Sequence, residues 1–214
     1  MHRLTSFLAS EEQSTVYDPE YIRGVFSCLP RLESKRLLLR PVSLRDALDM
    51  YEYSRDPEVA RHVLWDAHRS VSDSRHYIRY MLRQYRDGQP SSYAMVSKTE
   101  GRVIGTIGFM AFSEENRSVE IGYSMARRLW GQGLMAEAIQ LLLKLCFERM
   151  HLHRVEAMHE TGNPNSGIVL QKCGFQREGI LRDRVWNKGS FHDVAIWGIT
   201  EKDWCSMRDP SAGK

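Results

Sequence analysis

Two glycines, Gly131 and Gly133, stand between a strand-like run and a helix-like run, and their position suits them to hold an anion. The strand-like run covers residues 118–125, and apolar residues at helical spacing begin directly after Gly133. The first amides of a helix have no acceptor within the helix, and the helix dipole favours negative charge there. Glycine also lets a phosphate approach the backbone without meeting a Cβ. The spacing therefore predicts a site for a phosphate-bearing cofactor, and a purely structural turn is the alternative.

Other phosphate-binding motifs fit this glycine pair less well. A Walker loop ends in Gly-Lys-Ser/Thr, and the chain contains no such ending. A dinucleotide-binding loop has the pattern G-x-G-x-x-G/A, which Gly131, Gly133 and Ala136 satisfy formally. That loop also requires an acidic residue after a second strand, about twenty positions further on, where this chain has a helical pattern. The sequence thus favours a phosphate-bearing ligand outside these two classes.

The bulk composition is that of an ordinary globular protein. The chain has 214 residues, of which 42% are hydrophobic and 27% charged, with a net charge of +3. So small a charge argues against a DNA-binding protein, and neither a signal peptide nor a membrane-spanning run is expected. The cysteines form no C-x-x-C pair, which indicates reduced thiols and a cytoplasmic protein. No metal is expected, because no further ligand at suitable spacing joins His151 and His153.

Short strands and helices alternate along the chain. The strands are expected at residues 36–40, 92–97, 103–112, 118–125, 153–159, 175–185 and 191–200. The helices are expected at residues 17–26, 43–51, 59–63, 72–86, 131–149 and 163–173. The strand at 153–159 follows a helix, so it should run parallel to the strand before it. This order predicts an α+β domain with a mixed, mostly antiparallel central sheet of about seven strands and helices on both faces.

Several motifs in this order resemble the GCN5-related N-acetyltransferase (GNAT) family, and within it the RimJ/RimL branch that acetylates ribosomal-protein N-termini. They are Leu37-Leu38-Leu39-Arg40-Pro41, Glu120-Ile121-Gly122-Tyr123, Asn163-x-x-Ser166, Gly174-Phe175, Glu178-Gly179-x-Leu181-Arg182 and Phe191-His192-Asp193-Val194. The glycine turn is similar to the family's coenzyme A motif in two registers, which start at Arg128 or at Trp130. The resemblance covers residues 32–204, the expected acetyltransferase domain. Residues 1–31 are then an N-terminal extension, and residues 205–214 a C-terminal tail.

The resemblance implies an N-acetyltransferase that uses acetyl-CoA as donor, by direct transfer in a ternary complex. In the family, strands four and five splay apart, and the pantetheine arm lies in the gap between them. The residues implied to contact acetyl-CoA are Tyr123, Ser124, Met125, Gly131, Gln132, Gly133, Leu134, Met135, Ala136 and Asn163. For Asn163, capping of the helix that follows is a second and compatible interpretation.

Acetyl transfer to an amine requires a base for the amine proton and benefits from a hydrogen-bond donor to the leaving thiolate. Glu120 matches the catalytic glutamate of the histone-acetylating relatives and is the first candidate for the base. In the RimJ/RimL branch the base comes from a later strand region, where this chain has Val185, with Asp183 as a weaker candidate. The family's acid tyrosine corresponds to Leu170, so Ser166 is the candidate acid.

The expected acceptor is a protein N-terminal α-amino group. A small-molecule amine, such as an amino acid, a polyamine or an antibiotic, is one alternative. A non-catalytic acyl-CoA-binding module is the other, since leucine and valine occupy two catalytic positions of relatives. The residues expected to line the acceptor site are Trp65, His68, Tyr80 and Trp186. No DNA or membrane partner is expected, and the sequence leaves open whether the protein forms a homodimer.

Overall fold

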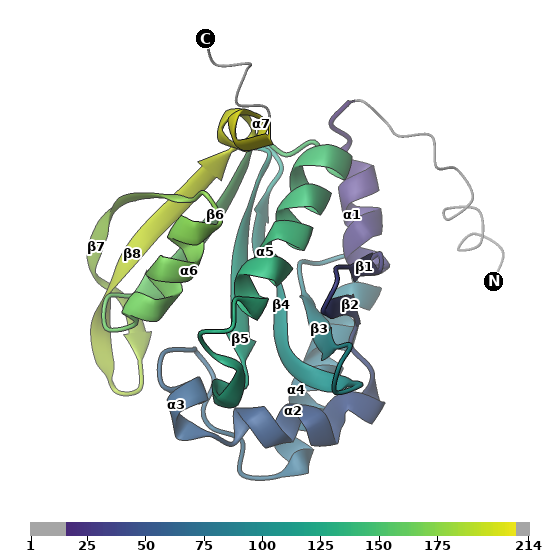
Figure 1. The fold of residues 1–214 in the computed structure, drawn as a ribbon, viewed down its shortest axis with the longest axis vertical. Coiled ribbons are helices and arrows are strands. Elements are labelled where there is room, and N and C mark those ends of the chain that lie inside the picture. Colours follow the sequence, from purple (N-terminus) through teal and green to yellow (C-terminus); the bar gives the residue numbers. More distant parts are fainter. Residues whose placement is uncertain (1–15, 209–214) are drawn as a thin grey trace, which may run out of the picture.

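The structure, a computed structural model, describes residues 16–208, so the outer parts of the expected extension and tail lie outside it. The helices are α1 (Pro19–Ser27), α2 (Ala47–Ser54), α3 (Pro57–Ala60), α4 (Val71–Arg86), α5 (Leu134–Lys144), α6 (Pro164–Lys172) and α7 (Glu201–Arg208) (Figure 1). The strands are β1 (Leu32–Glu33), β2 (Leu37–Pro41), β3 (Ser92–Ser97), β4 (Arg102–Ser113), β5 (Ser118–Met125), β6 (Arg154–Glu160), β7 (Gln176–Asn187) and β8 (Ser190–Thr200).

These strands form one mixed sheet in the order β1-β2-β3-β4-β5-β6-β8-β7. Only the β5–β6 pair is parallel among the pairings of the described chain, which confirms the mixed, mostly antiparallel sheet. The expectation of about seven strands misses β1, whose two residues pair with Leu39 and Leu38 of β2. A strand of this length is too short to show an alternating pattern.

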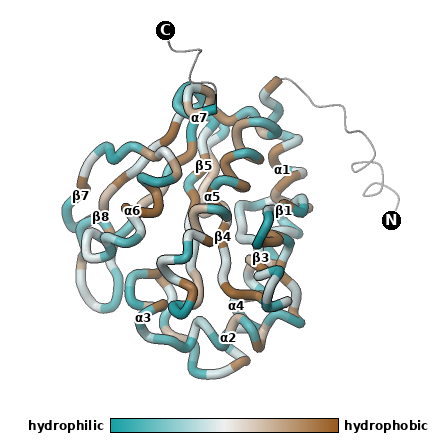
Figure 2. The backbone as a smooth tube through the Cα atoms, viewed as in Figure 1, coloured by the Kyte–Doolittle hydropathy of each residue, from teal (hydrophilic) through white to brown (hydrophobic). Residues whose placement is uncertain are grey.

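Helices cover both faces of the sheet. Figure 1 shows α5 and α6 in front of it and α4 behind it. Helix α1 buries Ile22, Val25 and Phe26, and the Phe26 ring lies 5.2 Å from that of Phe109 on β4. Part of the expected N-terminal extension therefore belongs to the hydrophobic core. Figure 2 shows hydrophobic stretches along α5, whereas the outermost strand β7 is mostly hydrophilic and exposed.

Strands β5 and β6 separate halfway along their length. Their ladder runs from Ser118, opposite Arg154, to Ile121, opposite Ala157. Beyond this point β5 continues to Met125 and β6 to Glu160 without pairing to each other. These are the fourth and fifth strands of the sequence-based count, so the expected splay is confirmed.

The helix expected at residues 131–149 begins later and ends differently. A 3-10 turn at Arg127–Leu129 comes first, and α5 starts only at Leu134. Gly131 and Gly133 both have left-handed backbone angles (φ +76° and +75°), which a continuing right-handed helix excludes. The last turn, Leu145–Arg149, is a π-helix. Apolar spacing alone does not distinguish these variants from a regular α-helix.

Candidate active site

The start of α5 presents backbone amides at the mouth of the gap between β5 and β6. Gly133 occupies the N-cap position, and the first helical bond runs from Glu137 N to Gly133 O at 3.1 Å. The N–H groups of Leu134, Met135 and Ala136 therefore precede the helical hydrogen-bond pattern. A Cβ added at Gly131 would meet no atom within 4 Å, so the space beside the turn is open. This geometry suits a phosphate group.

Arg36 binds this turn through contacts that the sequence did not indicate. Its Nη1 donates to the carbonyl oxygen of Gln132 at 2.9 Å, and its Nε donates to Glu137 Oε2 at 2.6 Å. Ser34 Oγ donates to the other oxygen of Glu137 at 2.5 Å. Burial acts to raise the pKa of Glu137, but the hydrogen bonds from Ser34 and Arg36 hold it below its usual value. The carboxylate therefore stays charged and ties the first turn of α5 to the segment before β2, from which Arg36 also reaches the loop between the two glycines.

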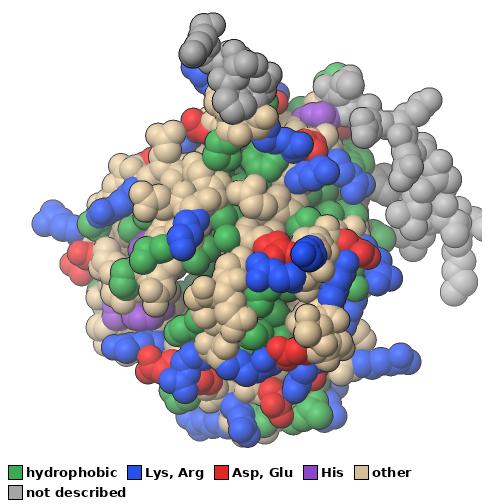
Figure 3. Space-filling model, viewed as in Figure 1, with side chains coloured by type: hydrophobic (Ala, Val, Ile, Leu, Met, Phe, Trp, Pro, Cys, Tyr) green, Lys and Arg blue, Asp and Glu red, His purple; other side chains and the backbone are tan. Residues whose placement is uncertain are grey.

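The basic pair before the glycines is already engaged in ion pairs. Arg127 Nε lies 2.8 Å from Asp56 Oδ2, and both end nitrogens of Arg128 bind the carboxylate of Glu100, at 2.6 and 2.5 Å. Figure 3 shows basic and acidic side chains next to one another over the lower part of this face. Because both arginines already have acidic partners, the amides at the start of α5 are the groups of the turn that remain available to an anion.

The backbone of β5 offers hydrogen-bonding groups to the gap at alternate residues. Ala126 N donates to a β4 carbonyl at 2.8 Å, so by antiparallel alternation Ser124 also pairs with β4. The backbone groups of Tyr123 and Met125 then point away from β4, into the gap. Trp130 Nε1 already donates to the Met125 carbonyl at 2.8 Å. The Met125 N–H and both backbone groups of Tyr123 are directed toward the place expected for pantetheine.

Glu120 is half-buried on the paired part of β5. Its direct neighbours across the sheet are Ala111 on β4 and Glu156 on β6. Burial, and secondly the charge of Glu156, raise the pKa of Glu120, while Arg184 acts in the opposite direction. A carboxylate with a raised pKa is a better base near neutral pH than an exposed one.

The two alternative base positions lie on the outer hairpin. Val185 carries no titratable group and pairs with His192 of β8. Asp183 is exposed at an irregularity of β7, with a left-handed backbone (φ +47°), and its N–H donates to Asp193 Oδ1 at 2.9 Å. Of the three positions considered for the base, only Glu120 is a half-buried carboxylate beside the gap.

The start of α6 places Asn163 and Ser166 on the other side of the gap. Asn163 is the N-cap residue, yet its side chain makes no capping hydrogen bond, so the capping interpretation is wrong. Ser166 Oγ lies 2.8 Å from the hydroxyl of Tyr123. Leu170, at the position of the family's acid tyrosine, is 0% exposed and part of the core.

Three of the four expected acceptor residues take part in one series of aromatic contacts. The rings of Trp65 and His68 lie 5.3 Å apart, His68 and Tyr77 6.2 Å, and Tyr77 stacks on Tyr80 at 6.4 Å. Burial lowers the pKa of His68, which favours its neutral form. Trp186 on β7 is not part of this series, and its ring lies 4.9 Å from that of Phe191 on β8.

The tip of the β7–β8 hairpin is fastened to the loop that carries Trp65. Lys188 Nζ donates to the carbonyl oxygens of Val63 and Trp65, at 3.3 and 3.0 Å. Beneath the tip, the buried carboxylate of Glu160 lies 2.7 Å from His62 Nδ1 and accepts from Asn187 Nδ2 at 2.6 Å. These contacts join sequence-distant residues, and no local motif indicated them.

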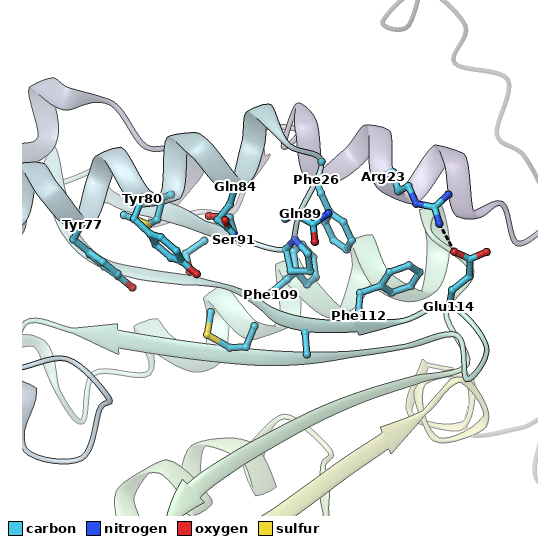
Figure 4. Close-up of a pocket in the computed structure, with 16 residues that line it drawn as sticks. Arg23, Phe26, Tyr77, Tyr80, Gln84, Gln89, Ser91, Phe109, Phe112 and Glu114 are labelled. Atoms are coloured by element: carbon cyan, nitrogen blue, oxygen red, sulfur yellow. Dashed lines mark hydrogen bonds and ion pairs between the residues drawn. The ribbon is translucent and has the colours of Figure 1, made fainter. Parts of the chain in front are cut away.

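A hollow of about 540 Å³ lies between α1, α4 and β4 (Figure 4). Tyr77 and Tyr80 stand at one end of it, and the ion pair of Arg23 with Glu114 closes the other. Ala111, the neighbour of Glu120 across the sheet, is among its lining residues. The hollow thus runs along β4 and passes Ala111, the residue paired with the candidate base.

Two further findings concern the described residues. Between residues 16 and 208, no group of three or more His, Cys, Asp or Glu side chains is placed to hold a metal ion. No helix in the same range is long and apolar enough to cross a membrane.

Comparison with known proteins agrees with this geometry. The profile of the acetyltransferase (GNAT) domain matches residues 36–176. The N-acetyltransferase p20 of Bacillus licheniformis is 35% identical, over 81% of this chain and 97% of that protein. The uS5-alanine N-acetyltransferase of Escherichia coli is 26% identical, over 83% and 94%. The structure of RimL, a ribosomal L7/L12 α-N-protein acetyltransferase in complex with coenzyme A, superposes with a TM-score of 0.72 at 19% identity, over 80% and 98%, a likeness in fold.

A parted strand pair beside an open helix N-terminus, on a mixed sheet with helices on both faces, defines an acyltransferase of the GNAT type. The chain belongs to the GNAT acetyltransferase family and is related to the ribosomal-protein N-acetyltransferases. It is therefore an acetyl-CoA-dependent N-acetyltransferase.

Proposed function

We propose that this protein acetylates the N-terminal α-amino group of a protein chain, by direct transfer from acetyl-CoA in a ternary complex. The observation that carries this choice of acceptor is the elongated hollow along β4, which passes Ala111, the cross-strand partner of Glu120 (Figure 4). A relative from E. coli is an N-acetyltransferase for an alanine of ribosomal protein uS5, and its acceptor is therefore a protein.

On the donor side, the amides of Gly131 to Ala136 hold the diphosphate of acetyl-CoA. The pantetheine arm pairs with the backbone of Tyr123 and Met125 in the gap, beside the side chain of Asn163. In this proposal the thioester lies near the Met125 N–H, which donates to the carbonyl oxygen as negative charge develops there. Ser124, whose backbone pairs with β4, contributes less than its neighbours.

On the acceptor side, Glu120 removes a proton from the attacking amine, through a water molecule. Its raised pKa suits this role, because a more basic carboxylate takes the proton more readily at neutral pH. The ammonium form of the amine has no free electron pair, so this step precedes or accompanies attack on the thioester.

The lining of the hollow favours a peptide over a small cationic amine. Aromatic side chains, among them Phe109, Phe112 and Tyr80, and the amides of Gln84 and Gln89 make up much of its wall (Figure 4). Its acidic member, Glu114, is neutralised by Arg23. A polyamine site would require unpaired carboxylates, whereas aromatic rings and amide groups suit the side chains and backbone of a peptide.

A thiol-release assay with acetyl-CoA tests the proposal. The acceptors are octapeptides with a free α-amine, the same peptides with a blocked N-terminus, and single amino acids and polyamines. We expect turnover of the free peptides, none of the blocked peptides, and kcat/KM that rises with length from two to eight residues. Equal or faster turnover of single amino acids or polyamines contradicts the peptide acceptor and supports a small-molecule enzyme. Coenzyme A binding without turnover of any amine supports a binding module.

A further inference from the structure

The hydroxyl groups of Tyr123 and Ser166 form a pair that joins β5 to α6 beside the gap between β5 and β6. The two oxygens lie 2.8 Å apart, and the tyrosine hydroxyl also lies 3.3 Å from the carbonyl oxygen of Ser166. Tyr123 stands two residues beyond Ile121, where the pairing of β5 with β6 ends. The pair is therefore positioned in the part of the gap that the thioester is expected to reach.

Tyr123 and Glu120 point to opposite faces of the sheet. Side chains alternate along a strand, so residues three apart lie on different faces. Tyr123 contacts α6. Glu120 lies on the other face of the sheet, with its cross-strand partner Ala111, which lines the hollow. Helices α5 and α6 pack together, with Gln140 Nε2 donating to the Cys173 carbonyl at 3.3 Å, so the phosphate-binding turn is on the Tyr123 face. The coenzyme thus arrives and leaves on the side of the hydroxyl pair.

A count of hydrogens shows what this pair can do. Each hydroxyl carries one hydrogen and can accept further bonds. If the tyrosine donates to Ser166 Oγ, the serine hydrogen remains free for a third atom. Burial raises the pKa of Tyr123 well above its usual value, so the phenol keeps its hydrogen throughout the working pH range. The alternative donor position on α6, Leu170, is an apolar core residue.

We propose that Tyr123 orients the hydroxyl group of Ser166 so that it donates a hydrogen bond to the leaving sulfur of acetyl-CoA. This inference rests on the proposed function for the direction of the reaction. The amine nitrogen bonds to the carbonyl carbon and loses its proton toward Glu120. The carbon–sulfur bond then breaks, and its electron pair goes to the sulfur. Ser166 stabilises the thiolate, which takes a proton from solvent on release, and Tyr123 is a positioning residue.

The test compares Tyr123→Phe, Ser166→Ala, Ser166→Thr and the double variant Tyr123→Phe/Ser166→Ala. For Ser166→Ala we expect a fall in kcat on the order of 100-fold, as for other donors to a developing charge. For Tyr123→Phe we expect about a tenfold fall, because the donor remains but loses its orientation. The double variant should be no slower than Ser166→Ala, and Ser166→Thr should retain most of the activity. The dissociation constant for coenzyme A, from calorimetry, should stay within about twofold of wild type.

A second measurement needs no acceptor. The ultraviolet absorbance of the thiolate reports the pKa of the coenzyme A thiol when it is bound to the protein. A hydrogen bond to the thiolate lowers this pKa, so it should be lower in wild type than in Ser166→Ala, with Tyr123→Phe in between. Tyr51→Phe, which removes a hydroxyl bonded to a backbone carbonyl at 3.4 Å elsewhere, is the matched control.

The outcomes separate this inference from the proposed function. If Tyr123→Phe keeps the wild-type kcat and the wild-type thiol pKa, Tyr123 only supports the packing of α6 and the inference is wrong. It is also wrong if the losses of the two single variants multiply in the double variant. If peptides are not acetylated but the bound thiol pKa shifts as expected, the acceptor assignment fails and the role of the pair stands.

Discussion

Replacement of His62 by alanine should destabilise the protein by weakening the contact between the Trp65 loop and the β7–β8 hairpin. Glu160 is 6% exposed, and His62 Nδ1 approaches its Oε2 to 2.7 Å. After the substitution, Asn187 remains as the direct partner of the carboxylate, at 2.6 Å. The other histidine nearby, His192, is 3.9 Å away, too far for a hydrogen bond.

The magnitude follows from the loss of one hydrogen bond to a buried charge. Such bonds contribute about 1.5–3 kcal/mol, and a central value of about 2 kcal/mol fits here because Glu160 keeps Asn187. For a chain of this length, about 2 kcal/mol lowers the melting temperature by roughly 4–8 °C. Burial acts to raise the pKa of Glu160, but the hydrogen bonds from Asn187 and His62 leave it lowered. Its stabilising contribution is thus present above the unfolded-state pKa and is lost as the pH falls through the lowered folded-state value.

Differential scanning calorimetry at neutral pH and at decreasing pH measures this effect. His153→Ala, which removes an exposed histidine, is the control for the change of residue type. We expect His62→Ala to melt several degrees below this control at pH 7 and the difference to shrink in acid. If the two variants melt together at pH 7, Glu160 does not gain stability from His62, and our account of this contact is refuted.

Three further predictions concern the turn, the base and the core. Gly133→Ala should lower stability by about 1–2 kcal/mol, because alanine is strained at φ +75°, and calorimetry should show weaker binding of coenzyme A. Glu120→Gln should lower kcat/KM about 100-fold and abolish its rise with pH, in pH-rate profiles against Glu115→Gln as control. Since the pKa of Glu120 is raised, its charged form costs stability as the pH rises, so Glu120→Gln should melt slightly higher at neutral pH. Phe26→Ala should cost about 3–5 kcal/mol in urea unfolding, because this side chain is 1% exposed.

Local patterns predicted those parts of the fold that depend on local physics. The glycine pair indicated an open helix start because left-handed backbone angles and missing side chains are properties of single residues. The parallel β5–β6 pair followed from the helix between the two strands. The motif around Glu120 placed a carboxylate beside the gap, and its half-buried position agrees with the role suggested for it.

Contacts between distant segments were not predictable in this way. Arg36 reaches the glycine turn across 96 positions of sequence, and Lys188 reaches the Trp65 loop across 123. No spacing rule links such residues, because only the folded sheet brings them together. The capping interpretation of Asn163 failed for a related reason, since a sequence cannot show which way a polar side chain turns.

The separation of β5 and β6 leaves an opening in the sheet that connects its two faces. Under the proposed function, acetyl-CoA binds on the side of α5 and α6, and the amine approaches from the side of α4. Each substrate then has a separate entry route, and neither blocks the binding or release of the other. We therefore expect that coenzyme A can leave while the acetylated product is still bound, so that turnover requires no fixed order of substrate binding and product release.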